Sequence, residues 1–232
     1  LSKPREAKFL AWLDEIKHDA QILFLMGDLF DFWHEWKYVV PKGYVRILGK
    51  LAELKDSGID IYFFVGNHDL WMKDYLEEEI GIPVFFEKQY YEISGKNFLL
   101  AHGDGLGPGD KGYKRMKKLF TNPIAQWFFK WLHPDIAMKI AVYFSTKNKM
   151  ISGVEDMKFL GEDKEFLILY SKEKLKSEKI DYFVYGHRHL PMILDLKIDE
   201  NAANYVNLGD WISYFTYGVF DGAEFKIEEY KQ

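Results

Sequence analysis

Residues 61–69 read Ile-Tyr-Phe-Phe-Val-Gly-Asn-His-Asp, a run of five apolar residues followed at once by a glycine and three polar side chains. The same change occurs over residues 22–28, 98–104 and 182–189, where apolar runs end in Asp or His. Short apolar runs with such ends are typical of buried strands. Because α/β sheets bind ligands at the carboxyl ends of their strands, we expect these polar side chains to form one site.

The spacing of apolar residues elsewhere predicts helices between these strands. We expect helices over 4–17, 43–57, 70–79 and 162–178, strands over 22–26, 60–65, 83–86, 89–93, 97–101 and 180–185, and an antiparallel meander over 191–230. A sheet of βαβ units normally opens with a strand, whereas this chain opens with a predicted helix. We therefore expect one domain over residues 1–232, with a first strand that precedes Leu1 in the native protein.

Composition narrows the class of protein. With 232 residues, 48% of them hydrophobic and 29% charged, the chain is typical of one globular domain. The formal net charge of -5 argues against nucleic acid as a partner, because binding to a phosphate backbone needs a basic surface. The absence of cysteine excludes thiolate zinc sites and disulfides within this sequence, and it fits a reducing cytoplasm. His, Asp and Asn remain as possible metal ligands.

The residues at the strand ends are those that a two-metal hydrolase needs. Such an enzyme uses a carboxylate to bridge its ions, neutral oxygen and nitrogen donors, and a water as nucleophile. Asp28 suits the bridge, although a Gly-Asp at a strand end is more often a simple turn. Asn67 offers an amide oxygen, with a plain turn as an equally weighted alternative. His102, His187 and His189 add imidazole nitrogens; each alone is weak, but four such motifs together indicate a metal-dependent hydrolase.

Taken together, the four motifs resemble the signature of the calcineurin-like metallophosphoesterases, over residues 22 to about 210. They read Gly27-Asp28-Leu29-Phe30-Asp31, Gly66-Asn67-His68-Asp69, His102-Gly103-Asp104 and Gly186-His187-Arg188-His189. The resemblance implies the α/β fold of that superfamily, a four-layer α/β/β/α sandwich with an inserted helical cap. It also implies two divalent metal ions, with Mn²⁺ as the expected metal.

The resemblance assigns the metal ligands. Asp28 would bridge the two ions, and His189 would bind one of them. Asn67, His102 and His187 would complete the site of the other ion. The superfamily also has an Asp-x-His motif at the end of its first strand, which nothing here matches. We expect that motif on the strand that precedes Leu1.

The resemblance also assigns two catalytic residues. His68 would contact the phosphate and assist the leaving group. Asp69 would orient the His68 ring.

Residues 105–160 differ in composition from the rest of the chain and are predicted to form the cap, with two or three helices. A basic cluster comes first, followed by apolar residues that could line a groove for acyl chains: Phe120, Trp127, Phe128, Trp131, Ile136, Ile140 and Phe144. For any one of these, packing against the sheets is the more common role. A basic run is likewise more often a solvated helix face.

The cap segment, with residues 206–211, is similar to the UDP-2,3-diacylglucosamine pyrophosphohydrolases of lipid A synthesis, whose cap binds acyl chains. That resemblance implies cleavage of the substrate diphosphate to UMP and 2,3-diacylglucosamine 1-phosphate. It also implies a cytoplasmic enzyme of a Gram-negative bacterium, peripheral on the inner membrane. The substrate-binding residues would be Asp104, Tyr113, Arg115, Asn122, Lys147 and Lys149.

Two alternatives remain open. A phosphodiesterase or phosphatase of the same superfamily would act on a different substrate, and it would have a cap with few apolar residues. A non-catalytic scaffold with this fold is supported only by the unmatched Asp-x-His motif.

Overall fold

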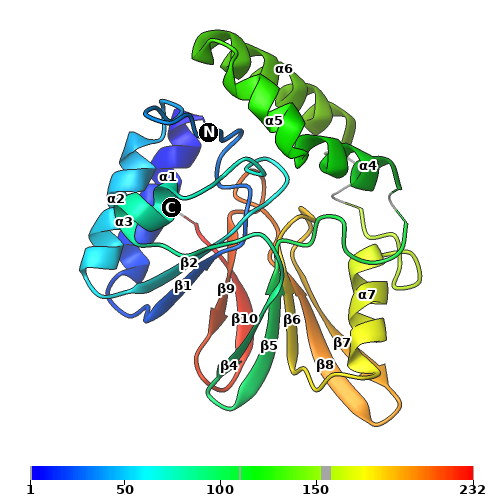
Figure 1. Cartoon of the computed structure of the whole chain (residues 1–232). Helices are drawn as coiled ribbons and strands as arrows, with labels where there is room; N and C mark the ends of the chain where they lie inside the picture. Colours follow the sequence, from blue (N-terminus) through cyan, green and yellow to red (C-terminus); the bar gives the residue numbers. More distant parts are fainter. Residues whose placement is uncertain (1, 110, 153–157, 232) are drawn as a thin grey trace. The chain divides into compact units, whose positions relative to one another are not determined.

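The computed structural model describes residues 2–109, 111–152 and 158–231, and the side chains of these residues except those of 144–152 (Figure 1). The chain forms two compact units. Unit 1 comprises Leu1–Phe86 and Met116–Lys149, and unit 2 comprises Glu87–Arg115 and Met150–Lys231.

Unit 1 contains a parallel three-stranded sheet in the order β1-β2-β3, formed by β1 (Ile22–Leu25), β2 (Asp60–Phe64) and β3 (Val84–Phe85). Three helices, α1 (Lys3–Ile16), α2 (Val45–Asp56) and α3 (Tyr75–Ile80), belong to the same unit. On α2 the fully buried residues Ile47, Leu51 and Leu54 recur at helical spacing, so they form one apolar face. Each such side chain stabilises the fold by about 1.5–3 kcal/mol.

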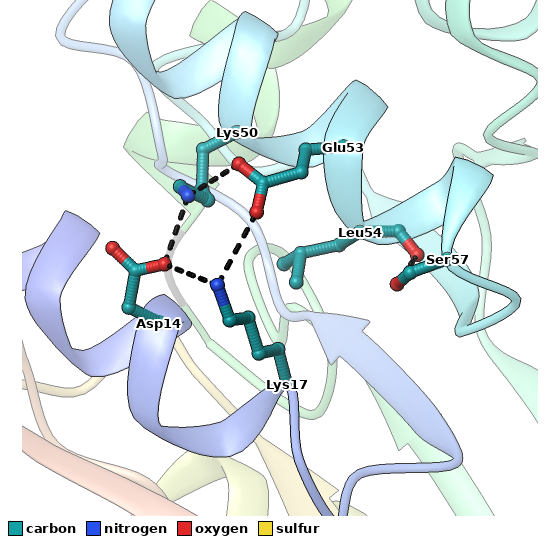
Figure 2. Close-up of polar contacts among 6 residues, drawn as sticks. All are labelled: Asp14, Lys17, Lys50, Glu53, Leu54 and Ser57. Atoms are coloured by element: carbon teal, nitrogen blue, oxygen red, sulfur yellow. Dashed lines mark hydrogen bonds and ion pairs between the residues drawn. The ribbon is translucent and has the colours of Figure 1, made fainter.

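On its solvent side α2 is joined to α1 by a network of four charged residues (Figure 2). The Lys50 ammonium lies 2.9 Å from Asp14 and 2.5 Å from Glu53, and the Lys17 ammonium lies 3.0 Å from Asp14. Hydrogen bonds from Lys50 and then from Lys17 lower the pKa of Asp14. Beyond the network, the Ser57 hydroxyl donates to the Leu54 carbonyl at 2.7 Å where α2 ends.

The predicted cap segment contains three helices: α4 (Lys111–Phe120), α5 (Pro123–Lys130) and α6 (Pro134–Ser152). Helix α5 begins where the sequence signals it, because the Asn122 side chain accepts the amides of Ile124 and Ala125 and Pro123 follows directly. None of the helices in the described part of the chain is long and apolar enough to cross a membrane.

Unit 2 contains a five-stranded sheet in the order β4-β5-β6-β8-β7. Its strands are β4 (Gln89–Ile93), β5 (Lys96–Ala101), β6 (Tyr182–Tyr185), β7 (Met192–Ile198) and β8 (Asn201–Asn207). The central pairs β5-β6 and β6-β8 are parallel, and the outer pairs are antiparallel. Helix α7 (Phe166–Leu175) lies beside β7 and β8 in Figure 1 and buries Leu167, Ile168 and Leu175 in the core of this unit.

The predicted antiparallel meander over 191–230 is wrong in two respects. Strand β8 lies between β7 and β6 and pairs with β6 in parallel. Strands β9 (Thr216–Phe220) and β10 (Phe225–Glu229) form a separate two-stranded sheet. Residues 211–214 form a turn rather than a strand, because one carboxylate oxygen of Asp210 accepts three successive backbone amides.

Helix α3 also begins later than predicted, at Tyr75 instead of residue 70. The reason is a carboxylate from a distant loop. The buried side chain of Glu35 accepts the amides of Lys73, of the N-cap residue Asp74 and of Tyr75, at 2.9, 3.1 and 3.3 Å, and so fixes the chain where the helix begins. A cap supplied from 38 to 40 residues away leaves no local sequence signal.

Candidate metal centre

The Asp28 carboxylate is aimed by a left-handed turn directly after β1. Gly27 has φ 92° and Asp28 itself has φ 56°, which is uncommon for a residue with a Cβ. The turn carries the carboxylate to the loop that follows β2, where its Oδ1 accepts the backbone amide of His68 at 2.8 Å. The first two motifs of the sequence are therefore in direct contact within unit 1.

Gly66 is required by that contact. A Cβ at this position would lie 2.3 Å from the Asp28 Oδ1 and 2.6 Å from the Asp28 backbone nitrogen. Both distances are far shorter than real Cβ contacts, so only glycine allows this approach. The turn is closed by Asp69, whose fully buried carboxylate accepts the Gly66 amide. The predicted role of Asp69 in orienting the His68 ring stays a prediction.

In unit 2, His102 and His187 follow the adjacent parallel strands β5 and β6, and their rings lie 5.2 Å apart. The Gly186 amide donates to the His102 carbonyl at 3.0 Å, which continues the pairing of these strands beyond their ends. His187 has φ 48°, so it too leaves its strand through a left-handed residue. Gly103, at φ 117°, passes so close to α7 that a Cβ would lie 3.1 Å from Leu167. Parallel register thus juxtaposes two predicted ligands.

His189 is held by a residue to which the sequence assigned no role. Its Nδ1 lies 3.0 Å from the Oδ2 of Asp210, a carboxylate whose side chain is 6% exposed. Burial raises the pKa of Asp210, but the hydrogen bonds of His189 and of three backbone amides outweigh it and lower the pKa to about 2. A signal was present, since Gly209-Asp210 comes shortly after strand β8 as Gly27-Asp28 comes shortly after β1.

The predicted substrate-binding residues are found in several environments. The Tyr113 hydroxyl donates to Asp104, and the Tyr113 ring lies 6.2 Å from the ring of His187. Arg115 is exposed on α4. The side-chain oxygen of Asn122 accepts two amides at the start of α5, which gives this residue a structural role. The side chains of Lys147 and Lys149 lie outside those that the structure describes.

Arg188 is a second residue that the sequence left without a role. It stands between the two histidines of its motif, yet its side chain is 6% exposed and lies 3.0 Å from the buried carboxylate of Glu165. It also donates to the Lys158 carbonyl at 2.6 Å. The loop of residues 186–189 is thereby connected to the segment that precedes α7.

A family model for calcineurin-like phosphoesterases matches residues 4–191 of this chain. The chain belongs to this family. This phosphoesterase is 40% identical to the UDP-2,3-diacylglucosamine hydrolase of Porphyromonas gingivalis, with 96% of this chain and 88% of the relative aligned. It is 28% identical to the protein of the same name from Edwardsiella ictaluri, with coverage of 88% and 78%, and 26% identical to that of Yersinia pestis, with coverage of 88% and 83%.

Among solved structures, the zinc complex of Vps29 from Entamoeba histolytica aligns over 89% of this phosphoesterase and 88% of that chain. The TM-score is 0.29 and the sequence identity is 11%, a likeness too distant to support a functional comparison. The family itself establishes a metal-dependent hydrolase with a mixed α/β fold, so both of these predictions are confirmed.

The candidate ligands of the phosphoesterase are divided between the units, with Asp28 and Asn67 in unit 1 and His102, His187 and His189 in unit 2. In the described part of the chain, no group of three or more His, Cys, Asp or Glu side chains is arranged to hold a metal ion. The donors themselves fit a divalent ion of the Mn²⁺ type, which accepts carboxylate, amide and imidazole ligands. Gly66 keeps clear the space beside the Asp28 carboxylate that a side chain would fill.

In unit 1, α5 and the last residue of α4 are anchored to the two loops that carry the candidate residues. Phe129 of α5 packs against Trp71 and His34, with ring centroids 4.4 and 5.1 Å apart, and the Trp71 indole donates to the Phe120 carbonyl at 2.6 Å. His34 is 1% exposed, and neither ring nitrogen has a hydrogen-bond partner among the residues that the structure describes. Burial, and then the charges of Lys73 and Lys130, lower the pKa of His34 to about 4. Phe129, Trp71 and His34 thus form an aromatic junction in unit 1, and the histidine in this junction is neutral.

Proposed function

We propose that this phosphoesterase hydrolyses the diphosphate of UDP-2,3-diacylglucosamine and releases UMP and 2,3-diacylglucosamine 1-phosphate. The observation that carries the proposal is the 40% identity to a UDP-2,3-diacylglucosamine hydrolase over nearly the whole of both chains. The motif residues support it, because the strand ends carry the oxygen and nitrogen donors that metal-assisted phosphoryl chemistry needs.

The proposed cofactors are two divalent ions, with Mn²⁺ as the metal. Asp28, Asn67, His102, His187 and His189 would hold them. When bound, such ions polarise a phosphoryl oxygen and make a water nucleophilic at neutral pH. The partly exposed His68 would contact the phosphate and assist the leaving group, and the Asp28 carboxylate fixes the backbone amide of this histidine. Asp69 holds the turn that presents it.

For the substrate, we propose binding by Asp104, Tyr113, Arg115, Asn122, Lys147 and Lys149. The hydrogen bond between Tyr113 and Asp104, beside His187, supports the first two. Arg115 is exposed and offers a planar cation that suits a phosphate.

The predicted cap, residues 105–160, would contact the acyl chains and the membrane surface. Trp131, Phe128 and Ile124 are 74%, 64% and 67% exposed, so these side chains do not pack against the sheets. Trp127, Ile136 and Ile140 are exposed as well. Exposed aromatic residues among lysines are typical of helices that lie in a membrane interface. This surface supports peripheral association with a membrane, which we propose to be the inner membrane at its cytoplasmic face.

The test is to incubate the purified chain with Mn²⁺ and UDP-2,3-diacylglucosamine and to follow UMP release, with a simple phosphodiester in parallel. We expect UMP from the acylated substrate only, and we expect chelation to abolish its release. An Asp28→Ala variant should lose both metal and activity. The control is Asp60→Ala, because Asp60 lies at the start of β2 with 63% of its side chain exposed.

Turnover of the simple diester alone would overturn the substrate and keep the metal chemistry. The absence of turnover on both substrates, in a chain that binds Mn²⁺, would overturn the proposed hydrolysis.

A further inference from the structure

The carboxylate of Asp210 is fixed at both oxygens. Its Oδ1 accepts the amides of Ile212, Ser213 and Tyr214 at 3.0, 2.7 and 3.0 Å. Its Oδ2 lies 3.0 Å from the Nδ1 of His189. A carboxylate whose first oxygen is held by three donors cannot rotate without breaking those bonds, so the second oxygen remains directed at the histidine.

The backbone around Asp210 is also held. The amide of Thr216, at the start of β9, donates to the Asp210 carbonyl at 3.2 Å, and the Thr216 hydroxyl donates to the Leu208 carbonyl at 2.7 Å. Gly209 has φ 77°, and a Cβ there would lie 2.5 Å from Thr216 and 2.9 Å from Pro191. The carboxylate is therefore attached to a tight corner rather than to a free loop.

We propose that Asp210 is a positioning residue that selects the tautomer of His189. Because a carboxylate oxygen only accepts, the neutral imidazole must carry its proton on Nδ1 to make this bond. The lone pair is then on Nε2, the nitrogen that remains for a metal. Metal-binding histidines generally have such a partner on the other ring nitrogen. The proposal rests on the proposed function in so far as His189 is a metal ligand.

The decisive variant is Asp210→Asn. The three backbone amides need an acceptor, so they hold the amide oxygen of the new side chain and turn its NH₂ group toward His189. The Nδ1 must then accept, the proton moves to Nε2, and the lone pair for the metal is lost. We expect the affinity for Mn²⁺ to fall by about 10- to 100-fold, the usual effect of losing such a partner.

Two measurements test this on the full chain. The first is Mn²⁺ affinity by titration calorimetry for the wild type and Asp210→Asn. The second is the tautomer of His189 in the metal-free chain, read from long-range ¹H–¹⁵N spectra at a pH where the ring is neutral and assigned with a His189→Gln variant. The matched control is Asp221→Asn, since the Asp221 carboxylate also accepts two backbone amides in a turn but lies on the exposed β9–β10 connection.

The expected result is an Nδ1–H tautomer in the wild type, an Nε2–H tautomer in Asp210→Asn, and no change in Asp221→Asn. An Nε2–H tautomer in the wild type would overturn the proposal even if the variant failed to fold. An unchanged tautomer and affinity in Asp210→Asn would overturn it as well. Since the spectra need neither metal nor substrate, the positioning role can stand or fail independently of whether UDP-2,3-diacylglucosamine is hydrolysed.

Discussion

The two units hold their candidate ligands by different means. In unit 1, the Asp28 carboxylate accepts a backbone amide of the loop after β2, at so close an approach that no side chain fits at residue 66. In unit 2, the register of parallel strands brings His102 beside His187, and a carboxylate 21 residues away fixes His189. The arrangement in unit 1 depends on a glycine at residue 66, which has no side chain. The arrangement in unit 2 depends on strand register and on a side-chain partner of His189.

That difference governs how each half should respond to mutation. A single methyl group at residue 66 would overlap both the Asp28 carboxylate and the Asp28 backbone nitrogen, so we expect the whole contact to fail. When the side-chain partner of a ligand is mutated, the ligand loses its orientation but keeps its position at the end of the strand. We therefore expect the largest single effect in unit 1 and graded effects in unit 2.

The largest effect is expected from Gly66→Ala, which places a methyl group 2.3 Å from the Asp28 Oδ1. The carboxylate or the turn must move, and a displacement of about 1 Å at a reacting centre costs on the order of 10²-fold in rate. We expect kcat/KM to fall by at least about that factor, with weaker Mn²⁺ binding. The control is Gly49→Ala in α2, where a Cβ meets none of the described residues within 4 Å and activity should be unchanged. An active Gly66→Ala enzyme would contradict the contact.

A smaller effect, on stability, is expected in unit 2 from Glu165→Gln. The substitution leaves the Arg188 guanidinium buried without its carboxylate, and breaking a buried ion pair from one side costs about 3 kcal/mol. Denaturant unfolding of the two chains measures this loss. The matched control is Glu162→Gln: Glu162 pairs with Lys172 at 2.7 Å but its side chain is 48% exposed, so at most about 1 kcal/mol should be lost. Equal losses in the two variants would contradict the distinction.

The aromatic junction of unit 1 should make the stability of the protein depend on pH. His34 has a pKa of about 4 in the fold and an ordinary value of 6.5, so between these values the unfolded chain binds a proton that the folded chain does not. Stability contributed by neutral His34 is therefore full above pH 6.5 and is lost as the pH falls toward 4, by about 3 kcal/mol in total.

A His34→Phe variant keeps the ring packing and cannot take up that proton. The difference in free energy of unfolding between His34→Phe and the wild type should therefore shift in favour of the variant by about 3 kcal/mol from pH 7 to pH 4. Urea titrations across that range measure it. His133→Phe, at an exposed position of the cap, is the control. Parallel stability curves for His34→Phe and the wild type would show that His34 is not held neutral.

The sequence predicted the strand ends well because their determinants are local. An apolar run, a glycine and a polar residue specify where β1, β2, β5 and β6 stop, and the parallel register then brings His102 and His187 together. The family signature and the hydrolase class followed from these residues and are confirmed.

The partners of those residues could not be read in the same way, because each comes from a distant segment. Glu35 caps a helix 38 to 40 residues later, Asp210 meets His189 across 21 residues, and Arg188 meets Glu165 across 23. The meander over 191–230 was wrong for a similar reason. Alternation of apolar and polar residues indicates strands but does not specify their neighbours, and β8 pairs with β6.

The smallest effect is expected from the exposed network between α1 and α2, which tests whether buried position rather than charge explains the cost of losing Glu165 (Figure 2). Asp14 accepts ammonium groups at 2.9 and 3.0 Å, as short as the Arg188–Glu165 contact, but its side chain is 49% exposed. Asp14→Asn should lower the free energy of unfolding by less than about 1 kcal/mol, and less again in about 1 M salt. Unfolding titrations at low and high salt measure both values. A loss as large as that of Glu165→Gln would mean that the network, and not the apolar face of α2, holds the two helices together.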